Sequence, residues 1–168
     1  WAIWADKNGK EKSNVNDIRF FNNIENTRLN PNVVLVGLNI SEKIKIPFGN
    51  FHSENPFAHD YKIRYALKNT ILWGAYMTDI IKDFEEKISH NLIKYLKNNN
   101  EFLTENINSF KDELTFIGSS NPILIAFGND CYKILSDTLK NKYSIYKVSH
   151  YSSYITKENL REEFLDII

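Results

Sequence analysis

The stretch VVLVGL, residues 33–38, is an almost unbroken apolar run, and it decides how the rest of the chain is interpreted. Two runs of the same kind cover residues 71–77 and 123–127, and a patchier one covers residues 143–148. Unbroken apolar runs of this length are typical of strands that are covered on both faces, as in parallel sheets. The sequence therefore predicts four parallel strands, of which the last is the most exposed.

Stretches with helical character separate these runs. Apolar side chains recur there at intervals of three and four residues, which is the pattern of a helix with one buried face. The helical segments predicted are residues 17–28, 63–71, 88–96, 103–114, 131–139 and 160–168. In the first of them we expect Phe21 and Ile24 to face inward. Strands that alternate with helices predict an α/β fold, here a three-layer α/β/α architecture with a short four-stranded parallel sheet.

The length and composition fit one domain with a single core. Hydrophobic residues make up 42% of the 168 residues, which is enough to build that core. The 21 basic and 21 acidic residues give a formal net charge of zero. Zero net charge counts against a protein that coats nucleic acid by bulk electrostatics, but it is compatible with a local basic patch. We expect residues 1–168 to form a single, monomeric domain.

Cysteine usage and hydropathy indicate where the protein works. The one cysteine, Cys131, excludes an intramolecular disulfide and fits a reducing compartment; its place on an apolar helix face predicts a core residue. No apolar run approaches the length of a membrane span, and no signal peptide is visible. We therefore expect a cytoplasmic protein with no membrane partner. The chain begins with Trp1 rather than methionine, which is consistent with a missing amino-terminal segment.

Polar residues follow every predicted strand, and ligands bind outside the carboxyl ends of strands in open α/β sheets. Asn39 follows the first run, Asp79 the second, Asn129 the third and His150 the fourth. Such residues also cap helices. We expect Asn129 to cap the helix that begins near Cys131, and a helix cap is also the alternative for Asp79. His150 can stabilise a developing anion or act as an acid; alternatively, it is bonded to a neighbouring main-chain group. The sequence therefore predicts a functional site around Asn39, Asp79 and His150.

A long connection, residues 40–57, follows the first strand, and loops of this length are often functional. Phe48 and Phe51 lie in it beside a glycine. They can form a wall on which a flat ring stacks, or they can plug the loop into the core. His52 and His59 have no acidic or cysteine partner at ligand spacing, so we expect no metal site.

Taken together, several segments resemble motifs of the uracil-DNA glycosylase superfamily, in an order that covers roughly residues 32–168. Gly37-Leu38-Asn39 resembles the end of the family's first motif, which usually continues with Pro-Gly. Residues 47–49, Pro-Phe-Gly, resemble the segment that stacks on the extruded base. Residues 76–79 resemble the strand end that reads the base edge. His150-Tyr151-Ser152 resembles the second catalytic motif, which is His-Pro-Ser in many members.

The resemblance implies an enzyme of DNA repair that flips a modified or deaminated base and hydrolyses its N-glycosidic bond. Asn39 would position a water molecule against the sugar carbon. His150 would stabilise the negative charge on the departing base. No metal or organic cofactor is implied, and the expected partner is DNA or a nucleobase or nucleoside ligand.

The resemblance also implies a set of substrate-binding residues. Phe48 would stack on the flipped base, and Asp79 would contact its edge. The other residues implied to bind substrate are Gly37, Leu38 and Ser152.

Three departures from the family pattern bear on this function. Asn39 is followed by Ile-Ser instead of Pro-Gly. Asp79 replaces the usual Asn, and because an ionised carboxylate only accepts hydrogen bonds, it would prefer a base that presents N–H donors. Tyr151 replaces proline in the segment that grips the DNA backbone.

The alternative function is a non-catalytic domain of the same fold that binds a nucleotide, a nucleic acid or a protein. A basic strip beside the site would favour nucleic acid, and its absence would favour a small ligand or a partner protein. Such a strip would consist of Lys43, Lys45, Lys147 and Lys157.

Overall fold

A computed structural model describes residues 1–26, 29–45, 47–53, 55 and 57–168, with backbone alone at residues 23–26. The chain divides into two compact units. The terminal unit comprises residues 1–30, 44–76 and 148–168, and the central unit comprises residues 31–43 and 77–147. Nothing in this division tests the prediction of a single domain, which stays a prediction.

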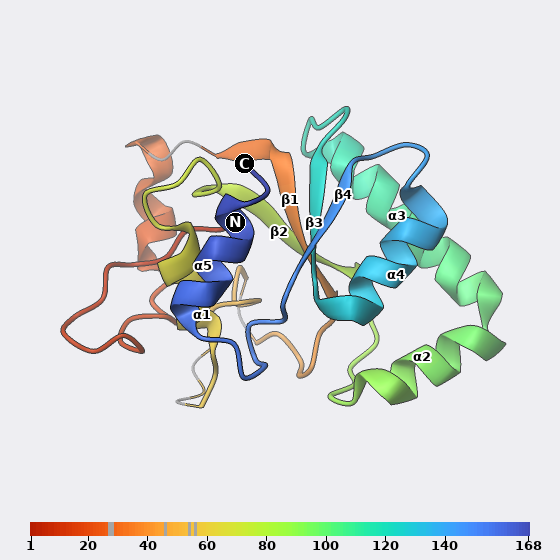
Figure 1. The fold of residues 1–168 in the computed structure, drawn as a ribbon, viewed down its shortest axis with the longest axis horizontal. Coiled ribbons are helices and arrows are strands. Elements are labelled where there is room, and N and C mark those ends of the chain that lie inside the picture. The colour runs from red at the N-terminus through yellow and green to blue at the C-terminus, as the bar shows by residue number, and fades with distance from the viewer. Residues whose placement is uncertain (27–28, 46, 54, 56) are drawn as a thin grey trace. The chain divides into compact units, whose positions relative to one another are not determined.

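A four-stranded parallel sheet carries the fold, with the strand order β2-β1-β3-β4 (Figure 1). Its strands are β1 (Asn30–Asn39), β2 (Ala75–Ile81), β3 (Ile123–Phe127) and β4 (Ile145–Val148). The central pair is aligned with Val33 beside Ile123 and Val36 beside Ala126. In β1 the side chains from Val34 to Val36 are fully buried. The predicted α/β fold with a short four-stranded parallel sheet is therefore confirmed.

The sequence predicted that the second strand begins at residue 71, but β2 begins at Ala75. Residues 71–74 form a turn instead, in which the main-chain N–H of Trp73 donates to the oxygen of Thr70 at 3.2 Å. Gly74 has a φ of +89°, a conformation that interrupts a strand and that glycine adopts without strain. The apolar residues before Gly74 therefore belong to a turn, in which Leu72 is buried and Ile71 is exposed, and the strand extends beyond the predicted end to Ile81.

Among the described residues, five α-helices accompany the sheet, and they supply the helical elements of a three-layer α/β/α fold. They are α1 (Asp60–Leu67), α2 (Ser89–Asn98), α3 (Asn100–Phe116), α4 (Gly128–Leu139) and α5 (Lys157–Leu165). The segment predicted as a helix over residues 17–28 is a 3-10 helix, η1 (Arg19–Asn26). The last two residues of the predicted segment, Thr27 and Arg28, lie outside the described residues, as does the side chain of Ile24. None of the helices in the described ranges is long and apolar enough to cross a membrane.

In the central unit, the predicted face of α4 is the buried one. α4 buries the four residues that the sequence pattern marked, Cys131, Ile134, Leu135 and Leu139. Its neighbour in sequence, β3, is buried from Leu124 onward. The interpretation of Cys131 as a core residue is thus confirmed.

In the terminal unit, α1 and α5 lie side by side (Figure 1), and an arginine ties them together. Arg161 of α5 donates from one guanidinium nitrogen to the main-chain oxygens of Tyr65, Ala66 and Lys68, at 2.8 to 3.1 Å. These carbonyls lie at or just beyond the carboxyl end of α1, where helix carbonyls lack intrahelical partners. The guanidinium therefore caps α1 from the neighbouring helix.

The amino-terminal segment is held against the same unit. The main-chain N–H of Ala2 donates to the oxygen of Ala75 at 2.8 Å, and that of Gly74 donates to the oxygen of Ala2 at 3.0 Å. Trp4 is buried and donates from its indole nitrogen to the oxygen of Phe51 at 3.1 Å. The segment around Trp4 therefore anchors both the start of β2 and the long loop of residues 40–57.

Candidate functional site

The predicted site residues divide between the two units. Gly37, Leu38, Asn39 and Asp79 belong to the central unit. Phe48, His150 and Ser152 belong to the terminal unit. The contacts of each predicted residue are therefore described within its own unit.

Asn39 ends β1, and three main-chain carbonyls surround its side-chain nitrogen. Nδ2 donates to the oxygens of Ile40 at 2.8 Å, Phe84 at 3.0 Å and Glu86 at 2.9 Å. Its two N–H groups are shared among these three acceptors. A flipped amide would place Oδ1 against the same carbonyls, so the contacts fix the amide orientation. Oδ1 is therefore a positioned hydrogen-bond acceptor that points away from them.

The other predicted residues of β1 contribute to packing. The thiol of Cys131 donates to the main-chain oxygens of Val36 at 3.3 Å and Gly37 at 3.4 Å. Burial raises the pKa of this thiol well above its ordinary value, and the carboxylates of Asp79 and Asp130 act in the same direction. Cys131 therefore stays protonated and joins α4 to the carboxyl end of β1. Gly37 is buried at this contact.

Asp79 lies within β2 rather than after it, and only 5% of it is exposed. Successive strand residues face opposite sides of a sheet, and Thr78 donates to a carboxylate oxygen of Glu113 on α3 at 2.8 Å. Asp79 therefore faces away from that contact, and its carboxylate contributes to raising the pKa of Cys131. The alternative interpretation, a cap of the next helix, is wrong because α2 begins at Ser89.

His150 follows β4, and Ser152 holds one side of its ring. The main-chain N–H of Ser152 donates to Nδ1 at 3.2 Å, and the Ser152 hydroxyl oxygen lies 2.7 Å from the same nitrogen. Because a main-chain N–H only donates, Nδ1 accepts, and the proton of the neutral imidazole is on Nε2. Burial lowers the pKa of His150 below its ordinary value, which favours this neutral form. The predicted bond to a neighbouring main-chain group is therefore present, and it sets the tautomer.

Two residues that the sequence did not single out hold the chain on either side of His150. Residues 149–155 are called the His150 loop here. Before His150, the main-chain N–H of Ser149 donates to Oε2 of Glu163 at 2.5 Å, and the Ser149 hydroxyl donates to Oε1 at 2.8 Å. Glu163 belongs to α5, so a carboxylate of that helix uses both oxygens to hold the start of the loop.

Lys62 of α1 holds the other end of the His150 loop. Its Nζ donates to the main-chain oxygens of Ser153 at 3.0 Å and Ile155 at 2.8 Å. Burial lowers the pKa of this ammonium, and the charge of Lys12 adds to that effect. The sequence analysis did not single out Lys62 or Glu163, because three of their four contacts are to main-chain groups, which carry no side-chain signature.

The two aromatic residues of the long loop have different environments. Phe51 is buried, and its ring meets that of Tyr151 edge to face at 6.2 Å, so the alternative of a core plug is confirmed for this residue. Phe48 is 57% exposed and stacks on Phe21 with ring centres 4.9 Å apart. Phe48 on Phe21 therefore forms an exposed aromatic platform in the terminal unit.

His52 has a structural environment. Its ring stacks on Trp4 at 5.0 Å, and its nitrogens lie 3.0 Å from the oxygen of Asn50 and 2.8 Å from that of Ile3. Burial lowers the pKa of His52, although the two carbonyl contacts act in the opposite direction. Within the part of the chain that the structure describes, no three His, Cys, Asp or Glu side chains are grouped to hold a metal ion.

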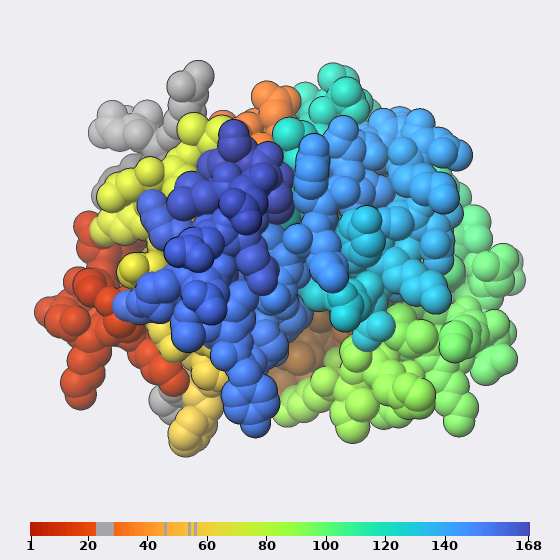
Figure 2. All heavy atoms as spheres, viewed as in Figure 1, coloured from red at the N-terminus to blue at the C-terminus, as the bar shows by residue number. Residues whose placement is uncertain are grey.

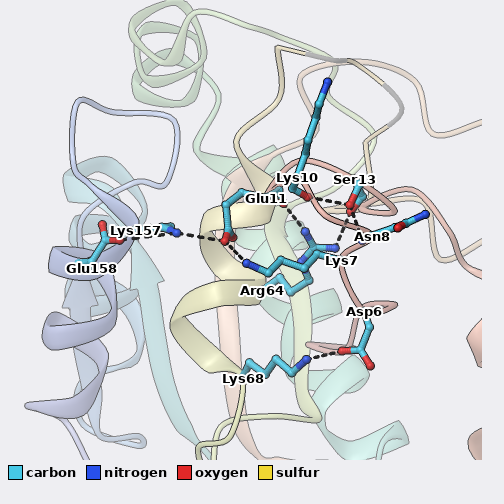
Figure 3. Close-up of polar contacts among 10 residues, drawn as sticks. All are labelled: Asp6, Lys7, Asn8, Lys10, Glu11, Ser13, Arg64, Lys68, Lys157 and Glu158. Carbon is cyan, nitrogen blue, oxygen red and sulfur yellow. Dashed lines mark hydrogen bonds and ion pairs between the residues drawn. The ribbon is translucent and has the colours of Figure 1, made fainter.

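The four lysines of the predicted basic strip divide equally between the two units. Lys147 donates to the side-chain oxygen of Asn129 at 2.8 Å. Asn129 lies in the first turn of α4, whose N-cap is Phe127, so the prediction that Asn129 caps this helix is wrong. Lys157 pairs with Glu11 at 3.2 Å and with Glu158 at 3.6 Å (Figure 3), so its charge is offset locally.

The described groups thus include a fixed amide acceptor at Asn39, a neutral imidazole with its proton on Nε2 at His150, and an exposed aromatic ring at Phe48. These are the donor, acceptor and stacking groups that recognition of a nucleobase uses. Comparisons of the chain with protein-family models, with curated proteins and with solved structures find no match. Function is therefore argued from these residues alone.

Proposed function

We propose that this chain is a uracil-DNA glycosylase-like protein that hydrolyses the N-glycosidic bond of a modified or deaminated base. The observation that carries the proposal is the state of the His150 ring. Ser152 holds Nδ1 as an acceptor, and burial lowers the pKa, so the neutral ring carries its proton on Nε2. A base that leaves a sugar carries developing negative charge, which a positioned neutral N–H donor stabilises without transferring its proton.

The geometry of Asn39 supports a second role in the same reaction. The attacking water needs an acceptor that orients one of its hydrogens. Oδ1 suits this role because three carbonyls hold the opposite end of the amide. The resulting acceptor is preorganised, so little reorganisation is needed during the reaction.

Two exposed aromatic side chains of the terminal unit support binding of a nucleic acid. Phe48 presents its ring from the long loop, and Tyr154 of the His150 loop is fully exposed. Aromatic rings stack on bases regardless of sequence, and each such contact contributes about 1–3 kcal/mol to binding. A protein with zero net charge gains little from bulk electrostatics, so stacking is the more important term in this proposal.

The choice of base is proposed from Asp79. A carboxylate at the base edge accepts hydrogen bonds and repels carbonyl oxygens. This favours bases whose edge presents N–H donors over uracil itself. The proposed substrates are therefore deaminated or modified bases of that kind.

A non-catalytic nucleotide- or nucleic-acid-binding domain of the same fold is the second candidate. The contacts of Asn39 favour it, because they tie the end of β1 to the segment after β2. Such a tie is useful for the fold whether or not any reaction takes place. For either candidate the proposed working form is a monomer in the cytoplasm, a proposal supported by the single, buried and protonated Cys131.

A strand-cleavage assay on oligonucleotides tests the first candidate. The substrates carry uracil, hypoxanthine, xanthine or a mismatch, and the variants are Asn39→Ala and His150→Ala. His90→Ala is the matched control, because His90 is an exposed histidine of α2. We expect excision of at least one base, its loss in both site variants and its retention in the control.

A folded protein that excises no base at high enzyme excess would overturn the catalytic proposal. Binding of the same oligonucleotides under those conditions would support the second candidate. Where excision is seen, the double variant adds a further criterion. Residues that act in one reaction have strongly non-additive effects, so the double variant should be about as inactive as the worse single variant.

A further inference from the structure

The His150 loop is held at both ends by charged side chains from two different helices. Glu163 of α5 binds the main-chain N–H and the hydroxyl of Ser149. Lys62 of α1 binds two main-chain oxygens of the loop, at Ser153 and Ile155. Figure 2 shows α5 and the chain that precedes it, in blue, on the face in view. The loop therefore lies at the surface, and hydrogen bonds to the carboxylate of Glu163 and the ammonium of Lys62 hold it in place.

The Lys62 contact is costly, which argues that it has a purpose beyond packing. Only 7% of Lys62 is exposed, and its two hydrogen-bond acceptors among the described residues are both main-chain oxygens. Taking an ammonium out of water carries a desolvation penalty unless hydrogen bonds compensate for it. Charge-assisted hydrogen bonds are about twice as strong as neutral ones. The two carbonyl bonds of Lys62 are of this kind, and they hold the chain just beyond Ser152.

The bonds to the His150 ring come from the stretch between these two attachments. Ser152 supplies both donors to Nδ1. The turn is closed by the main-chain N–H of Ser153, which donates to the oxygen of His150 at 2.9 Å. A shift of either end of the loop would therefore move Ser152 relative to the ring.

We propose that Lys62 and Glu163 are positioning residues that hold the two ends of the His150 loop and thereby fix the orientation and tautomer of the His150 ring. This inference rests on the proposed function and deepens it, since it names what keeps the proposed donor in place. Neither residue touches the reacting atoms. Each acts through the loop, and the loss of either end should affect the His150 ring.

The proposal predicts a change in the titration of His150. Hydrogen bonds donated to Nδ1 stabilise the neutral ring. Glu163→Ala releases Ser149, so the Ser152 donors move away from Nδ1 and the pKa of His150 rises toward the ordinary value of about 6.5. The charged groups that contact the loop from the elements packed against it are Glu163 on α5 and Lys62 on α1, and the latter is itself influenced by Lys12. Lys62→Met should act in the same direction because it removes the donors at the other end.

The variants are Glu163→Ala, Glu163→Gln and Lys62→Met. Glutamine retains one oxygen for the Ser149 N–H and an amide N–H for the Ser149 hydroxyl, so it should rescue the loop. Glu158→Ala on α5 and Lys68→Met at the C-cap of α1 are matched controls. Both side chains form exposed ion pairs outside the loop, with Lys157 and Asp6 respectively (Figure 3).

Two readouts are measured on the intact protein. Nitrogen-15 NMR of the His150 ring reports its tautomer and pKa without any substrate. The pH profile of excision reports the same group during the reaction. In Glu163→Ala we expect a raised His150 pKa, a mixed tautomer and a loss of kcat/KM of about 10- to 100-fold, as for misplacement of a reacting group by about an ångström. Glu163→Gln and both controls should keep the parent values.

A lowered melting temperature in Glu163→Ala with unchanged ring signals would overturn the positioning role. This comparison does not depend on Lys62→Met, whose buried carbonyl partners could leave that variant unfolded. Failure of the proposed function gives a different result. In that case the ring signals of His150 still change in Glu163→Ala, but neither the parent protein nor any variant excises a base. If excision has the same pH profile in Glu163→Ala and in the parent protein, the positioning role is wrong, whereas the proposed glycosylase function stands.

Discussion

At the scale of single residues, the same bonds that build the fold also orient the candidate functional groups. Asn39 joins the end of β1 to Phe84 and Glu86, and this leaves Oδ1 as the outward acceptor. His150 accepts from Ser152, and this leaves the ring proton on Nε2. A substitution at either residue therefore changes both stability and chemistry, and the two effects must be measured separately.

Asn39→Ala is expected to destabilise the protein by about 1–3 kcal/mol, because the carbonyls around Nδ2 lose their donor. Asn39→Asp should be at least as damaging, since it places a carboxylate oxygen against those carbonyls. Equilibrium unfolding in urea gives both values. The control is Asn129→Ala, whose side chain accepts a hydrogen bond from the exposed Lys147 and whose loss should change stability by no more than about 0.5 kcal/mol. Equal stability of Asn39→Ala and the control would show that the amide contacts do not stabilise the fold.

Sequence reasoning proposed His150 and Asn39 as site residues but did not single out the side chains that bond to the chain around His150. The histidine and the amide follow apolar strands, which is a pattern that the sequence displays. Glu163 and Lys62 bind main-chain groups, and their partners depend on how two loops and two helices meet. Asp79 was found, but its surroundings were not, because its burial depends on β2 continuing to Ile81.

At the scale of elements, periodicity located the helices and strands, whereas their ends depended on backbone conformation. The face of α4 was predicted completely, since burial at every third and fourth residue follows from helix geometry. The start of β2 was missed because Gly74 turns the chain at a positive φ. The segment over residues 17–28 was predicted as a helix but is the short 3-10 helix η1.

One buried side chain of α1 determines whether the amino-terminal segment stays in place. Arg64 donates to the main-chain oxygen of Ala5 at 3.1 Å. It also donates to that of Ser13 at 2.7 Å and contacts that of Glu11 (Figure 3). It is almost fully buried. Three carbonyls that are spread along the segment therefore converge on one guanidinium.

Arg64→Met should release residues 5–13 while the sheet stays folded. Hydrogen bonds to a charged group are worth about 1.5–3 kcal/mol each, so the released segment should be cut by trypsin at least roughly 10-fold faster after Lys7, Lys10 and Lys12. Limited proteolysis followed by mass spectrometry measures the rate at each site. Lys68→Met is the control, because its exposed pair with Asp6 contributes about 0–1 kcal/mol. Cleavage rates that match those of the control would mean that Arg64 does not hold the segment.

At the scale of the whole molecule, the two units differ in how their stability should depend on pH. Burial lowers the pKa values of three histidines, His52, His59 and His150, and all three belong to the terminal unit. A histidine whose pKa is lower in the folded state binds fewer protons there than in the unfolded state. Stability therefore falls as the pH drops below the unfolded value of about 6.5.

One carboxylate in the terminal unit acts in the opposite direction, but in a different range. Burial raises the pKa of Asp60, against a main-chain hydrogen bond from Ser53 that lowers it. Its folded state therefore binds more protons than the unfolded chain, and its contribution is lost as the pH rises through the window just above the unfolded value of about 3.9. Between about pH 7 and pH 5.5 the three histidines and the amino group of Trp1, whose pKa burial lowers to about 6, thus determine the trend. The Trp1 amino group acts in the same direction as the histidines, because a lowered pKa means that the folded state binds fewer protons.

We expect the terminal unit to open before the central unit on mild acidification. Hydrogen exchange, corrected for its intrinsic pH dependence, should show protection in α1 and α5 falling between about pH 7 and pH 5.5, while α3 and α4 change less. The variant His59→Gln/His150→Gln removes two of the three titrating rings and should flatten the response of α1 and α5. Parallel loss of protection in all four helices, or an unchanged response in the variant, would assign the acid sensitivity to groups other than these histidines. Loss of protection confined to α1 and α5 would also place the His150 loop in the less stable unit, since both of the side chains that hold it belong to those helices.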